Sequence, residues 1–199
     1  MTKTLEFLFD FASPNAYLSY RPAKEIANAR GAKFQITPVL LGGLFKLTGN
    51  QAPFVAFGSI PNKMAYEMKE MQRYVSAHGF SKFTMNPFFP INTVQIMRAF
   101  IAAQKAGDGD VYADTVLTAM WEGGQNMGDA EIITAVLNNA GLDAASLMSE
   151  ASSDPIKDAL KANTADAAER GAFGVPTFFV GDEMFFGKDR LGQVDQALA

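Results

Sequence analysis

The stretch Leu5-Glu6-Phe7-Leu8-Phe9-Asp10-Phe11-Ala12-Ser13-Pro14 decides the fold class of this chain of 199 residues. Its apolar first part is typical of a buried strand. Pro14 suits the first position of a helix, because its missing N–H would be unpaired there, and the helix pattern continues to Gly31. Ser13 is therefore the expected N-cap, with its hydroxyl at the positive end of a helix dipole. Such a hydroxyl can cap the helix or stabilise an anion brought by a ligand.

A second strand and a long helical stretch follow. The alternating segment Lys33–Val39 predicts a strand. A helix-length crossover links it to the first strand, so we expect the two strands to be parallel with a right-handed connection. From about residue 41 to about residue 170 the patterns indicate helices and loops, without a convincing strand. Recognisable ends place helices at Val94–Ile101, Tyr112–Glu122, Ala130–Leu137 and from Asp154-Pro155 onward.

The end of the chain returns to strands. Thr177–Val180 and Glu183–Phe186 predict a hairpin around Gly181-Asp182, and a last helix is expected from about Asp189 to Leu198. The order βαβ, helical block, ββα predicts an α/β fold. We expect a discontinuous thioredoxin-like domain over residues 1–40 and 171–199. A large all-helical insertion, which includes the linking helix, is expected over residues 41–170.

Composition excludes several kinds of chemistry. The chain has no cysteine, which excludes disulfides, thiolate metal sites and a protein thiol as nucleophile. Its single histidine, His78, excludes a multi-histidine metal site, so no metal is expected. His78 lies in a polar stretch and is interpreted as a solvated histidine at a helix end.

Charge and hydropathy narrow the expected partners. The formal net charge is −4 and no run of Lys or Arg suggests a nucleic-acid partner. Met1–Thr4 leads directly into the first strand and lacks the pattern of a signal peptide. No apolar segment is long enough to span a bilayer. We therefore expect a cytoplasmic protein that has no membrane partner.

The dipeptide Val175-Pro176 precedes the third strand and, in a thioredoxin-like fold, would face the N-terminus of the first helix. Proline cannot donate to a sheet ladder, so it marks the first residue of that strand. A cis bond here would turn the N–H and C=O of Val175 toward a ligand. The alternative is an ordinary trans proline that begins a strand.

Two long segments carry a family resemblance. Phe9–Leu18 and Phe173–Leu191 resemble the corresponding segments of the bacterial 2-hydroxychromene-2-carboxylate isomerases. These belong with the kappa-class glutathione transferases, on the DsbA-like version of the thioredoxin fold. Pro61-Asn62-Lys63 and Phe89–Thr93 match as well, and the likeness covers nearly the whole chain.

The resemblance implies glutathione as cofactor, with a serine in place of the redox cysteine. Ser13 would then donate a hydrogen bond to the glutathione sulfur and favour the thiolate, whose fraction is small at neutral pH in a free thiol. Val175, before Pro176, would pair its backbone with the cysteinyl part of the tripeptide. Asp189 would bind the γ-glutamyl ammonium, and the backbone amides of Lys188 and Asp189 would receive the γ-glutamyl carboxylate.

Lys63 and Asn50 match the polar residues that the family places near the glycyl end and the backbone of the tripeptide. Simpler interpretations exist, because Asp189 is also a good N-cap for the last helix and Lys63 alone reads as a solvated surface lysine. The helical block is rich in Met and Phe. These side chains could line an apolar pocket for an aromatic substrate, or simply pack the insertion.

The resemblance therefore implies a glutathione-dependent cis-trans isomerase. It would interconvert 2-hydroxychromene-2-carboxylate and trans-o-hydroxybenzylidenepyruvate in naphthalene-type aromatic catabolism. Its partners would be a small aromatic carboxylate substrate and, by family expectation, a second copy in a homodimer. One alternative is a kappa-like transferase that conjugates glutathione to electrophiles. Another is a non-catalytic DsbA-like binding protein, since Ser13 and Ala16 occupy both positions where thiol-disulfide exchange enzymes carry cysteine.

Overall fold

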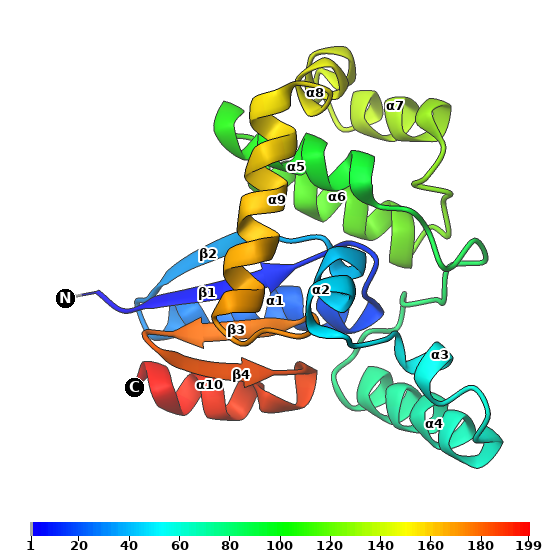
Figure 1. Cartoon of the computed structure of the whole chain (residues 1–199), viewed down its shortest axis with the longest axis vertical. Helices are drawn as coiled ribbons and strands as arrows, with labels where there is room; N and C mark the ends of the chain where they lie inside the picture. Colours follow the sequence, from blue (N-terminus) through cyan, green and yellow to red (C-terminus); the bar gives the residue numbers. More distant parts are fainter. Residues whose placement is uncertain (1) are drawn as a thin grey trace.

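The computed structural model describes residues 2–199, and the sheet within it has four strands in the order β2-β1-β3-β4 (Figure 1). β1 pairs in parallel with β2, in a register that runs from Thr4 opposite Lys33 to Phe9 opposite Pro38. β3 is antiparallel to β1 and to β4. The predicted parallel βαβ unit and the C-terminal hairpin are therefore both confirmed. The strands are β1 Thr4–Phe9, β2 Lys33–Pro38, β3 Thr177–Val180 and β4 Glu183–Phe186.

Helices cover both faces of this sheet. Figure 1 shows α9 (Asp154–Glu169) crossing in front of the strands, whereas α1 (Pro14–Ala29) lies behind them. α1 begins as its sequence predicts, because the Ser13 hydroxyl accepts the Ala16 N–H at 3.2 Å and Pro14 takes the first helical position.

The alternation of β1 builds two cores. Leu5, Phe7 and Phe9 are buried on one face, and Phe7 stacks on Phe178 of β3 with ring centroids 4.9 Å apart. Leu8 points the other way and joins a second buried cluster. Side chains of successive strand residues alternate between faces, so a central strand covered on both sides is apolar throughout.

The segment between β2 and β3 is helical. Figure 1 shows α5 to α8 gathered above the sheet, and α3 and α4 projecting at the lower right. The helix expected from Tyr112 begins three residues earlier, at Gly109. The helices of this segment are α2 Leu41–Thr48, α3 Pro53–Ala56, α4 Pro61–Ala77, α5 Val94–Ala106, α6 Gly109–Trp121, α7 Ala130–Asn139, α8 Ala144–Ala151 and α9.

The last predicted helix divides in two. A 3₁₀ turn, η1 (Lys188–Arg190), precedes α10 (Leu191–Leu198), so the prediction of a continuous helix from Asp189 is wrong at its start. Asp189 does not cap α10: the N-cap position falls on Arg190, and the Asp189 carboxylate pairs with Lys188. A tight 3₁₀ turn is a common way to open or close an α-helix.

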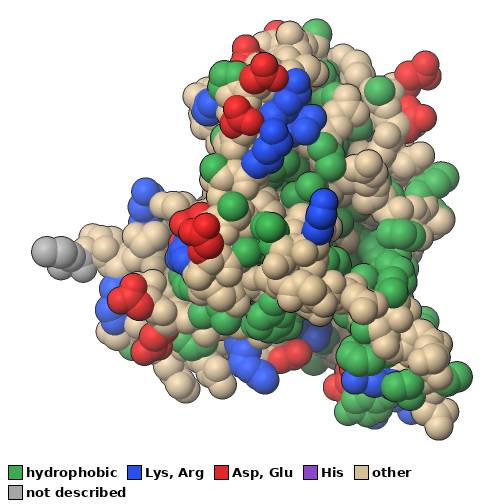
Figure 2. Space-filling view, viewed as in Figure 1, with side chains coloured by type: hydrophobic (Ala, Val, Ile, Leu, Met, Phe, Trp, Pro, Cys, Tyr) green, Lys and Arg blue, Asp and Glu red, His purple; other side chains and the backbone are tan. Residues whose placement is uncertain are grey.

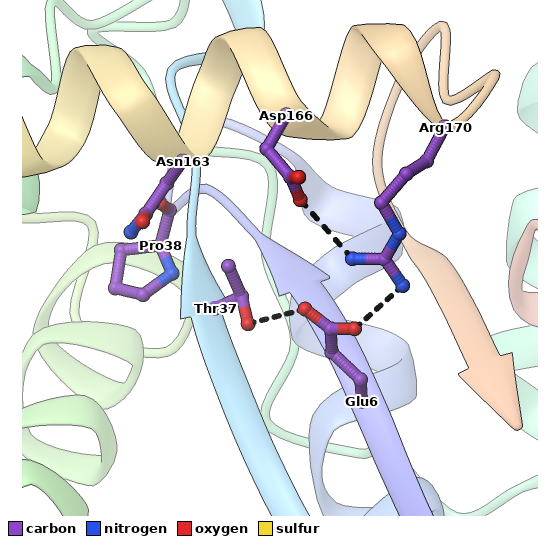
Figure 3. Close-up of polar contacts among 6 residues, drawn as sticks. All are labelled: Glu6, Thr37, Pro38, Asn163, Asp166 and Arg170. Atoms are coloured by element: carbon purple, nitrogen blue, oxygen red, sulfur yellow. Dashed lines mark hydrogen bonds and ion pairs between the residues drawn. The ribbon is translucent and has the colours of Figure 1, made fainter. Parts of the chain in front are cut away.

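A polar network holds α9 on the sheet (Figure 3). Glu6 of β1 accepts from Arg170 Nη2 at 2.8 Å and from Thr37 Oγ1 at 2.7 Å. Arg170 also pairs with Asp166 at 3.3 Å, and Asn163 Nδ2 donates to the Pro38 carbonyl at 3.0 Å. α9 thus packs directly on β1 and β2, although it lies within the range predicted for the insertion. The division into 1–40 with 171–199, and 41–170, stays a prediction.

Membrane crossing needs a helix that is both long and strongly apolar. None of the helices within residues 2–199 meets that requirement.

Candidate functional site

The start of α1 and the loop before β3 meet through Ser13. Its hydroxyl donates to the Val175 carbonyl oxygen at 3.3 Å, and Ser13 as a residue is 5% exposed. The Val175–Pro176 peptide bond is cis, as the thioredoxin-like architecture predicts. The structure therefore brings together Ser13, Val175 and Pro176, at the positive end of the α1 dipole.

Asn50 reaches the same loop from the end of α2. Its Nδ2 donates to the Phe173 carbonyl at 2.8 Å, two residues before Val175, and its Oδ1 accepts the Gln51 N–H at 2.8 Å. The side chain therefore ties the first helix of the helical block to the loop that carries the cis peptide.

Lys188 and Asp189 lie on the other side of Pro176. The Gly187 N–H donates to the Pro176 carbonyl at 2.9 Å, which sets η1 beside the loop. Lys188 Nζ pairs with the Asp189 carboxylate at 3.1 Å and lies 4.8 Å from the centre of the Tyr74 ring on α4. The Lys188 side chain is only 11% exposed, whereas that of Asp189 is 63% exposed.

A hollow of about 340 Å³ separates α4 from η1. Charges of both signs line it, so it suits a zwitterionic group better than a purely apolar one. The lining residues are Glu67, Glu70, Arg73, Tyr74, Ala77, Lys188 and Asp189.

Lys63 lies apart from the other candidates. It occupies the first turn of α4, and its Nζ lies 3.3 Å from the centre of the Phe57 ring. Within residues 2–199 its ammonium makes no hydrogen bond to the other candidate residues. An ammonium over an aromatic face is a stable cation–π contact, which explains this placement without a ligand.

Aromatic side chains lead from the Ser13 turn to the surface. Trp121 is fully buried, and its Nε1 donates to the Phe11 carbonyl at 3.1 Å. Phe89 lies 6.2 Å from Trp121 and 5.6 Å from Phe54, between ring centroids. Phe54 and Phe88 are 41% and 53% exposed. This apolar series is suited to an aromatic substrate, since offset and edge-on ring contacts are favourable.

The methionines of the helical block, whose role the sequence left open, divide between core and surface. Met97, Met120 and Met127 are buried, and Met71 packs against the core. Met68 and Met85 are exposed, and α4 contains no buried residue. Figure 2 shows hydrophobic side chains gathered along the edge from which α3 and α4 project. These side chains do not form a closed core there. His78 is exposed at the C-terminal end of α4, as predicted, and stacks on Tyr74.

Sequence reasoning missed two residues beside Ser13, namely Asp10 and Thr93. Asp10 is completely buried, and burial raises the pKa of its carboxyl above the ordinary value although three hydrogen bonds oppose that shift. One of these bonds comes from the Thr93 hydroxyl at 2.7 Å. The signal in the sequence that could have identified Asp10 is its position as a lone carboxylate between Phe9 and Phe11, at the end of a buried strand.

Tyr17 lies one turn after Ser13 on α1. Burial, together with its hydrogen bond to Glu122 at 3.0 Å, raises the pKa of Tyr17 to about 12. Its hydroxyl therefore stays protonated at neutral pH.

Within residues 2–199, no group of three or more His, Asp or Glu side chains has the arrangement of a metal site.

With this geometry established, comparison with known proteins defines the family. The chain belongs to the DSBA-like thioredoxin domain family, whose match extends over residues 4–199. The predicted thioredoxin-like fold with a helical insertion is therefore confirmed.

Individual relatives agree with the resemblance read from the motifs. A 2-hydroxychromene-2-carboxylate isomerase from Pseudomonas putida is 27% identical, over 98% of this chain and 93% of its own length. Glutathione S-transferase kappa 1 from Rattus norvegicus is 25% identical, over 95% of this chain and 88% of its own. A solved 2-hydroxychromene-2-carboxylate isomerase superposes with a TM-score of 0.82 at 26% identity, covering 98% of this chain and 94% of the other.

Proposed function

We propose that this chain is a glutathione-dependent isomerase that interconverts 2-hydroxychromene-2-carboxylate and trans-o-hydroxybenzylidenepyruvate, or close analogues. The observation that carries the proposal is the contact of the Ser13 hydroxyl with the Val175 carbonyl at the N-terminus of α1. The full-length similarity to relatives of that name supports it.

The residues around Ser13 fit a tripeptide thiol. Val175 and Pro176 would hold the cysteinyl part, because a backbone edge beside a helix start can pair with an added strand. Asp189 and the amides of Lys188 and Asp189 would hold the γ-glutamyl end, next to the hollow of mixed charge. Asn50 and Lys63 are assigned to the backbone and the glycyl end.

Bound glutathione would supply a thiolate that adds reversibly to the unsaturated substrate, so that a double bond becomes a single bond about which the molecule can turn. The role of Ser13 is to donate a hydrogen bond from its hydroxyl to that sulfur. A free thiol titrates at about 8.5, and a donor at the positive end of a helix lowers this value. Ser13 therefore acts as a thiolate stabiliser, whereas the protein itself provides no covalent nucleophile.

The Ser13 hydroxyl can donate its hydrogen bond to either of two acceptors, the Val175 carbonyl oxygen or the sulfur of bound glutathione. In the structure it points to the Val175 carbonyl, which is also the group assigned to the cysteinyl N–H. When that carbonyl takes a ligand N–H, the Ser13 proton becomes free to turn to the sulfur. Binding of the tripeptide backbone and stabilisation of the thiolate are in this way coupled at one atom.

The substrate would be a small aromatic carboxylate. The aromatic series from Trp121 to Phe54 offers the apolar contact for its ring and keeps water from the reacting atoms. We place the reaction in naphthalene-type aromatic catabolism in the cytoplasm, where thiols are kept reduced.

We also propose a homodimer. Large apolar side chains on α2 to α4 and their connecting loops are exposed, and a second copy of this chain would cover them. Sedimentation equilibrium is expected to give twice the 21.5 kDa mass of the chain, and a monomer mass would overturn this proposal. These side chains are Leu47, Phe54, Val55, Ile60, Tyr66 and Met68.

A second candidate is a kappa-type transferase, favoured by the similarity to Glutathione S-transferase kappa 1. It would use every residue of the proposed cofactor site, so those residues cannot separate the two activities. Accumulation of a thioether with an electrophile such as a chlorodinitrobenzene would favour the transferase. A binding protein without catalytic activity would show neither reaction.

The deciding experiment is spectrophotometric isomerisation of 2-hydroxychromene-2-carboxylate after exhaustive dialysis, with and without added glutathione. We expect rapid equilibration only when glutathione is present. Equal turnover without glutathione would refute the mechanism. Binding of glutathione without isomerisation would move the function to the transferase or to another substrate.

A further inference from the structure

Asp10 has a carboxylate that is fully enclosed and fully engaged. Its Oδ1 accepts the Ala12 N–H at 2.9 Å and the Thr93 hydroxyl at 2.7 Å, and its Oδ2 accepts the Leu41 N–H at 2.7 Å. Each partner donates, so the geometry suits the ionised form. A buried carboxylate is costly unless it is paired in this manner, and such a group calls for an explanation of what it holds in place.

The three donors come from three separate segments. Ala12 belongs to the turn between β1 and α1, Leu41 is the first residue of α2, and Thr93 immediately precedes α5. The N-cap residue of α2, Leu40, makes no capping hydrogen bond of its own. Asp10, which directly follows β1, therefore caps α2 from a distant part of the chain, with its negative charge at the positive end of that helix.

The same contacts form a closed ring that contains Ser13. The Ser13 N–H donates to the Asp10 carbonyl at 3.1 Å, which closes the turn. At the far end of α2, Asn50 holds the Phe173 carbonyl, and two residues later Val175 accepts the Ser13 hydroxyl. A displacement at Asp10 would consequently reach Ser13 both through the turn and through α2.

We infer that Asp10 is a positioning residue, which sets the Ser13 hydroxyl relative to Val175 by fixing the Ser13 turn to the starts of α2 and α5. This role rests on the proposed function, because it acts through Ser13. Reacting groups that are misplaced by about 1 Å can lose about 100-fold in rate, so a small shift of the hydroxyl is sufficient.

The test begins with Asp10→Asn. The amide keeps the shape of the side chain but turns one acceptor into a donor that faces only donors. We expect turnover to fall about 10- to 100-fold, while the Kd for glutathione changes less than about threefold. Thr93→Val removes one donor and leaves the Asp10 charge, so we expect a smaller fall in the same direction.

The matched control is Thr164→Val. Thr164 is buried, and its hydroxyl accepts the Leu40 N–H at 2.9 Å at the same helix start, without touching the Ser13 turn. We expect this variant to lose stability but to keep turnover within about twofold. An equal loss of turnover in Thr164→Val would assign the effect to α2 stability in general and overturn the role of Asp10.

A double-mutant cycle with Ser13→Ala distinguishes a role of Asp10 that acts through Ser13 from a general effect of Asp10 on folding. If Asp10 acts through Ser13, Asp10→Asn has little further effect on turnover in the Ser13→Ala background. Multiplicative losses would overturn the inference. If Asp10→Asn does not fold, as circular dichroism would show, the cycle of Thr93→Val with Ser13→Ala tests the same coupling.

The two proposals fail in different ways. Wild-type protein that shows no glutathione-dependent turnover overturns the proposed function, and the role of Asp10 with it. Wild-type turnover combined with multiplicative losses in the Asp10→Asn cycle, or in the Thr93→Val cycle where Asp10→Asn does not fold, overturns the role of Asp10 alone.

Discussion

The Ser13 hydroxyl lies 3.3 Å from the Val175 carbonyl oxygen, although 162 positions separate the two residues in the chain. The same hydroxyl accepts the Ala16 N–H at 3.2 Å. One side chain therefore caps α1 and touches the backbone edge on which a peptide ligand would lie.

Ser13→Ala should lower isomerase turnover about 10- to 100-fold, because a hydrogen bond to a charged group contributes about 1.5–3 kcal/mol. The Kd for glutathione should change less than about threefold, since other residues hold the tripeptide. Stopped-flow turnover and calorimetry measure the two quantities. Loss of the cap should also cost about 1 kcal/mol of unfolding free energy.

Ser19→Ala is the matched control for that variant, since Ser19 is a second buried serine of α1 and donates to the Asn15 carbonyl at 2.7 Å. It should leave turnover unchanged. If Ser13→Ala also left turnover unchanged, Ser13 would be a helix cap and no more.

Asp189→Asn should weaken glutathione binding about three- to tenfold, through loss of the partner for the γ-glutamyl ammonium. The effect is kept modest because this carboxylate is 63% exposed and already paired with Lys188. Isothermal calorimetry at low ionic strength is the measurement. Asp182→Asn, in the exposed β3–β4 turn, is the control, and equal affinities in both variants would contradict the assignment of Asp189.

Asn50→Asp should lower glutathione-dependent turnover about three- to tenfold. The substitution keeps the acceptor for the Gln51 N–H but replaces the donor to the Phe173 carbonyl with a carboxylate oxygen, which is repelled by that carbonyl oxygen. Asn138→Asp in α7 is the control, because Asn138 Oδ1 accepts the Ala144 N–H at 3.4 Å and an aspartate keeps that acceptor. Unchanged turnover in Asn50→Asp would mean that this tie does not position the loop.

Glu6→Gln tests the network that holds α9 on the sheet (Figure 3). Burial alone would raise the pKa of Glu6, but the hydrogen bonds from Arg170 and Thr37 and the Arg170 charge outweigh burial, so the pKa lies below its ordinary 4.5. A lowered pKa in the folded state stabilises the protein above that ordinary value, and the contribution is lost as the pH falls through the folded-state pKa.

Urea unfolding should therefore show Glu6→Gln to be less stable than wild type by roughly 1–2 kcal/mol at pH 7, with a smaller difference at pH 3.5. Glu150→Gln, at an exposed position of α8, should show no difference at either pH. A Glu6→Gln deficit that stayed constant between the two pH values would show that the charge of Glu6 is not what stabilises the contact.

Sequence alone determined the features that depend on near neighbours. The apolar run of β1, the alternation of β2, the Ser13-Pro14 helix start and the hairpin after Pro176 were all predictable, because strand patterns and helix capping act within a few residues. The division of the last helix into η1 and α10 was not predicted. Asp189 has the chemistry of an N-cap, but it lies within the 3₁₀ turn and the N-cap position of α10 falls on Arg190.

Only the tertiary structure decided what meets Ser13 and what surrounds it. Asp10 was visible as a charge in an apolar strand, but its partners lie 31 and 83 positions away, and which donors reach a buried carboxylate depends on how whole helices pack. Lys188 likewise finds Tyr74 only because α4 folds back beside η1. Local capping preferences place the Ser13 hydroxyl at the start of a helix, and long-range packing determines which groups it contacts.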